Sequence, residues 1–420
     1  MRSGATERVR GDMQPSVITG LGIVTALGDG LSENLAAAKA GTVGIAPFDP
    51  EWGRGAPPAA CAAQILDDRW EPDLGERGAA MDRGTRLGLS AMEQALNHAG
   101  LSTAGLDGVG IVAGAAGPSS ALYSALAPRM RDESWRTASR GSQAPNLCGH
   151  ALAGLAGLRF GATGPNAGIS AACASGSLAI AMADDMVRLG RAQIVLAGAA
   201  DSFLTELALG SFAKAGAIST ESDPLSACLP FDRRRGGLVF GEGAAFVVVE
   251  DRAHAERRGA PVVAEILGSA SANDGRHMWA PDPDRWAMTI AAALRRAEVA
   301  PNEIALVSAH APGTVFGDLA ESSALRMVLE SEAGHIPVTS TKGMHGHAMG
   351  ASPSIEIVLS IAAMQERRAL PTVGCGDQDP DIDLRVTSGG EPIHGDVLLK
   401  TAFGFMGTHT VLAFRVPPAP

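Results

Sequence analysis

Short apolar runs alternate with longer amphipathic stretches through most of the 420-residue sequence. The runs at 108–114 and 193–198 are rich in Val, Ile, Leu, Ala and Gly, as buried strands are. The stretch at 86–100 places Leu, Met and Ala on one helical face and ends at glycine. The second half repeats the alternation, with expected strands at 262–268 and 304–308. This pattern predicts an α/β fold whose strands are mainly buried.

We expect the chain to consist of three segments. Residues 1–15 carry Arg, Glu, Asp and Gly ahead of the first apolar run, which is typical of a disordered leader. Residues 16–260 form the first half of the fold, and residues 261–420 form the second half. Because no proline-rich linker separates the two halves, we do not expect them to fold independently.

Composition and charge argue against several classes of function. The net charge of −11 argues against nonspecific binding to nucleic acid, which needs a basic surface. The five cysteines are widely spaced and include no CxxC pair, which favours a reducing, cytoplasmic location over a disulfide framework or a zinc site. The uncharged stretch at 160–183 is long enough to cross a bilayer. Its four glycines, its proline and its polar residues favour a buried corner, so we expect no membrane contact.

One cysteine lies at an expected strand-to-helix corner. The sequence Gly164-Pro-Asn-Ala-Gly-Ile-Ser-Ala-Ala-Cys173 leads into a helix rich in Ala, Leu, Ile and Met. The free N–H groups and the dipole of a helix N-terminus lower the pKa of a thiol and favour the nucleophilic thiolate. A buried structural cysteine is the alternative, because free cysteine is among the most buried residue types.

Three loops of the second half end expected strands and carry further reactive side chains. The first contains His310, the second contains Lys342, His345 and His347, and the third is the glycine-aromatic turn at 402–409. Catalytic groups in layered α/β proteins lie on loops of this kind. A thiol together with two histidines from different strand ends is typical of thiol-dependent acyl transfer.

Each of these side chains also has a simpler interpretation. A single histidine after a strand is more often a hydrogen-bonding surface residue than a catalyst, and Lys342 is equally compatible with an exposed charge. His345 and His347 have the spacing of a metal-ligand pair, but no third ligand is evident, so we expect no metal. The glycines at 20 and 22 lack the third glycine of a dinucleotide-binding fingerprint, and we expect no cofactor.

Several motifs follow one another in order along the chain and together identify a family resemblance. They are Val17-Ile-Thr-Gly-Leu-Gly, Ala171-Ala-Cys173-Ala, Pro230-Phe-Asp-Arg-Arg-Arg235, Gly241-Glu-Gly243-Ala, His277-Met-x-Ala-Pro-Asp-Pro283 and Lys342-x-x-x-Gly346-His347. From about residue 16 to residue 416 the chain resembles the β-ketoacyl synthases of the thiolase fold. It is most similar to β-ketoacyl-acyl-carrier-protein synthase II and to type II polyketide ketosynthases.

The resemblance implies a five-layered α-β-α-β-α sandwich made of two pseudo-repeats, normally assembled as a homodimer. It also implies that Cys173 carries the acyl chain as a thioester. His310 and His347 would polarise the malonyl thioester as its carboxylate leaves, and Lys342 would support both histidines. The backbone N–H groups of Cys173 and Phe403 would form the oxyanion hole, and Phe403 would gate the acyl pocket.

The sequence departs from the usual family pattern around the substrate. The usual His-Gly-Thr-Gly-Thr reads His310-Ala-Pro312-Gly-Thr314, so Thr314 keeps one hydroxyl for the pantetheine arm while Pro312 removes another hydroxyl and a backbone N–H. The usual Gly-Phe-Gly-Gly turn contains Met406, which adds bulk beside the gate and stiffens it, and Ala171 replaces a threonine. The residues expected at the substrate are Pro312, Thr314, Gly404, Phe405 and Met406.

We therefore predict an acyltransferase of the β-ketoacyl-acyl-carrier-protein synthase type. It would be a free-standing ketosynthase of fatty-acid or polyketide-type biosynthesis that takes an acyl chain from an acyl carrier protein onto Cys173. It would then condense this chain with a malonyl-type extender by decarboxylative Claisen chemistry, so its substrates would be small-molecule acyl thioesters of undetermined chain length. A ketosynthase-like cyclase or acyltransferase that does not extend the chain is the alternative. A noncatalytic chain-length partner subunit is a weaker alternative, because such partners usually lack the cysteine.

The expected partner is an acyl carrier protein supplied as a separate chain. Because such carriers are acidic, docking would need a local basic surface on this acidic protein. The candidate residues are Arg129, Arg131, Arg136 and Arg140 in one segment, and Arg233, Arg234 and Arg235 in another.

Overall fold

The computed structural model describes residues 16–48, 60–69, 71–72, 81–117, 134 and 141–419. The predicted disordered leader, residues 1–15, lies outside them. The main feature of the structure is a 12-stranded sheet. A separate two-stranded sheet is formed by β3 (Ala46–Pro47) and β4 (Cys61–Ala62). The strands of the large sheet are β1 (Ser16–Thr25), β2 (Gly28–Asp29), β5 (Gly110–Gly114), β6 (Asn166–Ile169), β7 (Ile194–Ser202), β8 (Glu242–Asp251), β9 (Ala264–Asn273), β10 (Ile304–Ser308), β11 (Pro337–Thr339), β12 (Arg385–Val386), β13 (Val397–Phe403) and β14 (Thr408–Arg415).

The sheet contains the same strand order twice. The first half runs β6-β5-β7-β8-β1, and the second half runs β11-β10-β13-β14-β9. In each half the first three strands are parallel and the remaining neighbours are antiparallel. The halves meet where β1 and β9 pair over two residues, Val17 with Glu265 and Ile18 with Ala264. The chain therefore contains two pseudo-repeats, as the resemblance implied.

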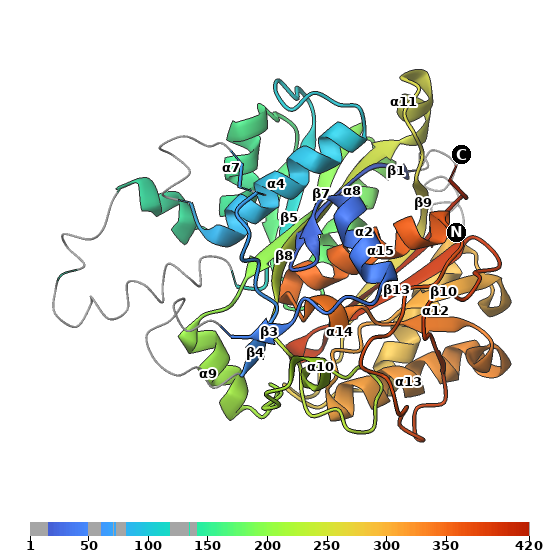
Figure 1. Cartoon of the computed structure of the whole chain (residues 1–420). Helices are drawn as coiled ribbons and strands as arrows, with labels where there is room; N and C mark the ends of the chain where they lie inside the picture. The colour runs from blue at the N-terminus through green and yellow to red at the C-terminus, as the bar shows by residue number, and fades with distance from the viewer. Residues whose placement is uncertain are drawn as a thin grey trace.

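The helices form three layers around the two halves of the sheet (Figure 1). The central layer is α8 and α15, whose apolar side chains share one core with strands of both halves. The outer layers are α4 with α7 on the first half and α12 with α13 on the second half. This α-β-α-β-α order confirms the predicted fold class. The helices are α2 (Leu31–Lys39), α4 (Arg83–His98), α7 (Ala151–Phe160), α8 (Ser175–Arg188), α9 (Glu206–Lys214), α10 (Pro224–Ala227), α11 (Arg252–Arg257), α12 (Pro283–Ala297), α13 (Val315–Leu329), α14 (Lys342–His345) and α15 (Ser352–Gln365).

The two central helices determine where the functional groups lie. α15 is buried along its whole length from Ser352 to Met364, as expected for a helix that is apolar all round. Small residues let it approach α8 closely, since a Cβ atom at Gly176 would lie 2.2 Å from the Ser354 hydroxyl oxygen. The high content of Ala and Gly thus serves close packing in the centre, where the N-terminal ends of α8 and α15 come together.

Candidate active site

Cys173 lies at the corner between β6 and α8 and is 2 % exposed. The preceding Ala172 has a φ of 48°, a left-handed conformation that turns the chain sharply and is uncommon for residues other than glycine. The Ser175 hydroxyl fixes this turn. It accepts a hydrogen bond from the Ala171 N–H at 2.9 Å and donates one to the Ala172 carbonyl at 2.6 Å. The strand-to-helix corner expected from the sequence is therefore present, and it is buried.

Burial raises the pKa of the Cys173 thiol to about 12. The positive charge of Lys342 and the backbone N–H groups of Phe405 and Cys173 lower this pKa, but burial outweighs them. The sequence-based expectation of a lowered pKa was wrong, because it considered the helix N-terminus and not the desolvation of the thiol. The thiol is protonated at neutral pH, so a neighbouring base has to remove the proton before sulfur can attack a thioester.

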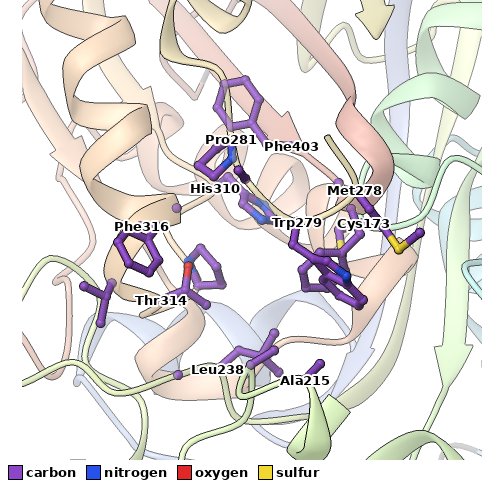
Figure 2. A pocket seen from close by; sticks show the side chains of 18 of the residues that line it. Cys173, Ala215, Leu238, Met278, Trp279, Pro281, His310, Thr314, Phe316 and Phe403 are labelled. Carbon is purple, nitrogen blue, oxygen red and sulfur yellow. The ribbon is translucent and has the colours of Figure 1, made fainter. Parts of the chain in front are cut away.

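His310 and His347 line the same cavity as Cys173, which has a volume of about 350 Å³ (Figure 2). Their rings lie 5.4 Å apart between centroids and are inclined at 78°. His310 follows β10, and its backbone N–H donates to the Glu321 carboxylate at 2.8 Å. His347 follows α14, and its Nδ1 lies 2.8 Å from the Ser352 hydroxyl oxygen. The fold thus brings two histidines of the second half to the cysteine of the first.

Burial lowers the pKa of His310 and of His347 well below the ordinary value of 6.5, and the positive charge of Lys342 lowers both further. Both rings are therefore neutral at pH 7. A neutral imidazole offers one hydrogen-bond donor and one acceptor, so each ring can accept a proton from a thiol or donate to a carbonyl oxygen.

We expect the second-order rate constant for condensation, kcat/KM, to change by less than about twofold between about pH 8 and pH 6.5. A histidine of ordinary pKa would begin to protonate in this range, whereas His310 and His347 stay neutral. Because their folded-state pKa values are lowered, the stability they contribute is present above pH 6.5 and is lost as the pH falls below it. Circular dichroism at each pH separates unfolding from titration. An acid limb centred near 6.5 in fully folded enzyme would contradict this assignment.

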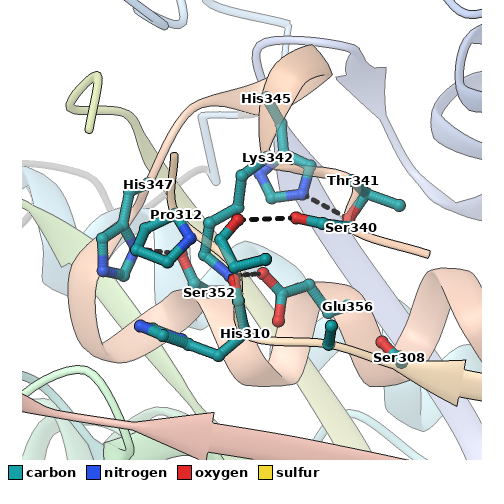
Figure 3. Close-up of polar contacts among 12 residues, drawn as sticks. Ser308, His310, Pro312, Ser340, Thr341, Lys342, His345, His347, Ser352 and Glu356 are labelled. Carbon is teal, nitrogen blue, oxygen red and sulfur yellow. Dashed lines mark hydrogen bonds and ion pairs between the residues drawn. The ribbon is translucent and has the colours of Figure 1, made fainter. Parts of the chain in front are cut away.

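Lys342 pairs with the buried Glu356 carboxylate near His310 (Figure 3), and Lys400 pairs with the same carboxylate, so the three residues form a buried charge cluster. Its Nζ donates to the Glu356 carboxylate and to the backbone carbonyl of His310. Lys400 Nζ lies 2.5 Å from the other Glu356 oxygen and donates to the Ser308 carbonyl at 3.1 Å. Lys342 therefore holds the His310 backbone, and its positive charge acts on Cys173, His310 and His347.

Glu356 and Lys400 were not among the site residues expected from the sequence. Both could have been noticed in the sequence, because Glu356 is the one charged residue of the stretch at 352–364 and Lys400 interrupts the largely apolar run of β13. A charged side chain inside a fully buried helix or strand needs a partner of opposite charge. A buried glutamate and a buried lysine in the same sequence therefore indicate an ion pair.

In the turn after β13, the backbone N–H that faces the thiol belongs to a different phenylalanine from the one expected. The backbone N–H that faces the Cys173 sulfur, besides that of Cys173 itself, belongs to Phe405. The Phe403 ring instead lies flat on Trp286, with 3.7 Å between centroids and 6° between planes. The Phe405 ring contacts Trp279 at 5.0 Å and Phe212 at 5.3 Å, also between centroids. Both phenylalanines line the cavity, and Phe405 occupies the position that the sequence analysis assigned to Phe403.

Four of the five residues expected at the substrate line the cavity, namely Pro312, Thr314, Gly404 and Phe405. Met406 does not. Its φ of 62° turns its side chain outward, where it is 62 % exposed, and its N–H donates to the Met278 carbonyl at 3.0 Å. The expectation that Met406 adds bulk beside the substrate is therefore corrected.

The three consecutive arginines proposed as a basic docking surface are paired within the chain. Arg233 lies 2.6 Å from Asp377, Arg234 lies 2.8 Å from Asp232, and Arg235 lies 2.5 Å from Asp379. Arg235 is buried, and it also donates to the Thr314 carbonyl at 3.3 Å and the Val315 carbonyl at 3.0 Å. Arg235 thus holds one edge of the cavity in place, and each of the three arginines is paired with an aspartate. The other candidates, Arg129, Arg131, Arg136 and Arg140, lie outside the described residues.

The metal alternative finds no support in the described residues. His345 Nε2 lies 2.8 Å from the Thr341 hydroxyl oxygen. No group of three or more His, Cys, Asp or Glu side chains that could hold a metal ion occurs in the described part of the chain. Over the same residues, none of the helices has both the length and the apolar character needed to cross a bilayer.

The duplicated sheet around a shared helical layer defines the class of thiolase-fold enzymes, and comparison with known families specifies the class further. The N-terminal domain of the β-ketoacyl synthases matches residues 13–255, and their C-terminal domain matches residues 263–375. The chain therefore belongs to the β-ketoacyl synthase family and is an acyltransferase-class enzyme.

Known relatives and solved structures agree with this family. The 3-oxoacyl-acyl-carrier-protein synthase 2 of Synechocystis is 33% identical over 418 residues, covering 95% of this chain and 97% of that protein. A β-ketoacyl synthase structure from Burkholderia phymatum is 30% identical with a TM-score of 0.87, covering 96% of this chain and 100% of that one. A type II polyketide ketosynthase, in complex with its acyl-carrier protein and bound to the hexaketide, is 29% identical with a TM-score of 0.83, covering 96% and 99%.

Proposed function

We propose that the protein is a ketosynthase that takes an acyl group from an acyl carrier protein onto Cys173 and joins it to a malonyl-type extender with loss of carbon dioxide. The observation that carries this proposal is the meeting of Cys173, His310 and His347 in one buried cavity. A thiol and two neutral imidazoles supply a nucleophile, a proton acceptor and hydrogen-bond donors, which are the groups that thioester exchange and enolate formation need.

In the first step, a neutral histidine takes the proton of the Cys173 thiol as sulfur attacks the carbonyl carbon of the carrier-bound thioester. The bond to the carrier sulfur breaks, and that sulfur leaves as a thiol after the histidine returns the proton. The negative charge that develops on the carbonyl oxygen is stabilised by backbone N–H donors. We assign these donors to Cys173 and Phe405, because their N–H groups face the Cys173 sulfur. This assignment replaces Phe403.

In the second step, the malonyl thioester loses carbon dioxide, and the electron pair of the broken carbon–carbon bond becomes an enolate. His310 and His347 donate hydrogen bonds to its oxygen, and the neutral state of both rings leaves an N–H available for this purpose. The enolate carbon then attacks the Cys173 acyl carbon. The carbon–sulfur bond breaks, and Cys173 is released as a thiol after taking up a proton.

Partner, assembly and location follow from the same proposal. The likeness to a ketosynthase solved with its acyl-carrier protein supports a carrier partner, and the family favours a homodimer in fatty-acid or polyketide-type biosynthesis. All five cysteines are free, which supports a cytoplasmic location.

The experiment that tests the proposal supplies an acyl carrier protein loaded with an acyl group, followed by one loaded with malonate. Intact mass should show an acyl adduct on Cys173, and addition of the malonyl carrier should release carbon dioxide and a β-ketoacyl product. We expect His310→Ala and His347→Ala each to abolish condensation while leaving acylation of Cys173 partly intact. An adduct without carbon dioxide release would favour the transfer or cyclisation alternative, and equal loss of acylation in both variants would contradict the separate roles.

A further inference from the structure

Four phenylalanines form a contiguous group beside Cys173, which we call the phenylalanine cluster: Phe203, Phe212, Phe240 and Phe405. The centroids of rings that contact each other lie 5.2–6.2 Å apart, in edge-to-face and stacked arrangements. They belong to the same packed apolar cluster as the Cys173 side chain. In a chain with 11 phenylalanines and 4% aromatic residues, this concentration at the nucleophile is unusual.

The cluster separates two sides of the nucleophile. On one side lies the cavity of about 350 Å³, whose mouth is edged by Trp279 and Phe316, 50 % and 75 % exposed. Of the cluster, Phe405 lines this cavity, and Phe203, Phe212 and Phe240 do not. On the other side these three rings pack with the cysteine; Phe203 directly follows β7, Phe212 lies on α9, and Phe240 shortly precedes β8. Within the described residues, the open space at Cys173 therefore lies toward the mouth.

Phe203 is partly exposed, but its ring is packed against neighbours on two sides. A Cβ atom at Gly117 would lie 1.8 Å from the Phe203 ring, so the ring rests directly on the Gly117 backbone. That backbone is itself fixed, because the buried Asp201 carboxylate accepts the N–H groups of Ala116 at 2.9 Å and Gly117 at 3.4 Å. On its other side the ring stacks on Phe240, which is fully buried. The ring has well-packed neighbours on both faces, and displacing it disturbs both.

This arrangement limits the acyl group on Cys173. The extender and its carrier arm have to reach the cysteine through the mouth, so an acyl chain that stayed in the cavity would obstruct them. A chain directed the other way would have to displace rings of the phenylalanine cluster. We propose that the phenylalanine cluster restricts Cys173 to short acyl groups and that Phe203 is the residue that sets the limit. The inference rests on the proposed function and adds the substrate class to it.

The test compares the rate of Cys173 acylation by acetyl, butyryl and octanoyl thioesters of N-acetylcysteamine, followed by intact mass. We expect the wild-type enzyme to react with the octanoyl donor at least about tenfold more slowly than with the acetyl donor. Phe203→Ala should raise the octanoyl rate by about tenfold and change the acetyl rate by less than about twofold. Leu207→Ala, on the same stretch but 70 % exposed, is the matched control and should leave the ratio of rates unchanged.

Phe203→Leu removes less volume, so its ratio of octanoyl to acetyl acylation rates should lie between those of the wild-type enzyme and Phe203→Ala. If the alanine variant does not fold, the leucine variant is used for the test. Equal acetyl and octanoyl rates in the wild-type enzyme would overturn the inference and leave the proposed function intact. An unchanged ratio in folded Phe203 variants would also overturn it, by showing that another residue sets the limit. Absence of any adduct with all three donors would overturn the proposed function itself, and the inference with it.

Discussion

Replacing Cys173 by alanine will lower the rate of condensation by at least about 10³-fold and remove the acyl adduct seen by intact mass. Among the described residues that line the cavity, Cys173 carries the one thiol and Thr314 carries the one hydroxyl. The backbone of the corner is held by Ser175 and tolerates alanine, because the neighbouring residues at 171, 172 and 174 are already alanine. The loss will therefore reflect chemistry and not folding.

The matched control is Cys148→Ala, which removes an exposed free thiol away from the cavity. Acylation and condensation should be unchanged in this variant, and an alkylating reagent should lose its exposed target. An acyl adduct that persists in Cys173→Ala and disappears in Cys148→Ala would show that the nucleophile has been misassigned.

Glu356→Gln will lower the free energy of unfolding by about 3–5 kcal/mol. Burial raises the pKa of the Glu356 carboxyl, but the positive charges of Lys342 and Lys400 outweigh it and hold the pKa below 4.5. Removing the negative charge leaves two buried ammonium groups without their carboxylate partner, and burial already lowers the pKa of Lys400. Chemical denaturation at neutral pH measures the loss. Because the folded-state pKa of Glu356 is depressed, its contribution is present above pH 4.5 and is lost as the pH falls below it.

Glu366→Gln provides a control with the same chemical change. Glu366 pairs with Lys39 at the surface, where the two side chains are 40 % and 46 % exposed. Surface pairs contribute little, so this variant should change the free energy of unfolding by less than about 1 kcal/mol. Equal losses in the two variants would show that the buried cluster carries no special stabilisation.

Much of the fold could be predicted from local pattern. The expected strand at 304–308 coincides with β10, and the expected helix at 86–100 corresponds to α4 over Arg83–His98. Apolar periodicity and glycine stops are properties of neighbouring residues, so they are readable without the tertiary structure. The family motifs then supplied the layer order, which periodicity alone does not define.

The site could be predicted as a set of residues but not in its electrostatics or its fine geometry. The pKa of Cys173 depends on how completely other segments bury it, and this is not a local property. The N–H donor expected at Phe403 belongs to Phe405, two residues further along the chain. In a tight turn, a shift of two residues changes which N–H faces the sulfur. Met406 was expected at the substrate because it replaces a glycine of the family's usual terminal turn, whereas its left-handed backbone directs its side chain to solvent.

The repeated strand order relates the two halves of the site to each other. Cys173 lies between the third strand and the following long helix of the first repeat, β6 and α8, and His347 lies between the corresponding elements of the second, β11 and α15. Equivalent corners of the two repeats thus hold a thiol in one repeat and an imidazole in the other. Neither repeat alone supplies all the groups that meet in the cavity, so the two halves have to pack together before the site exists.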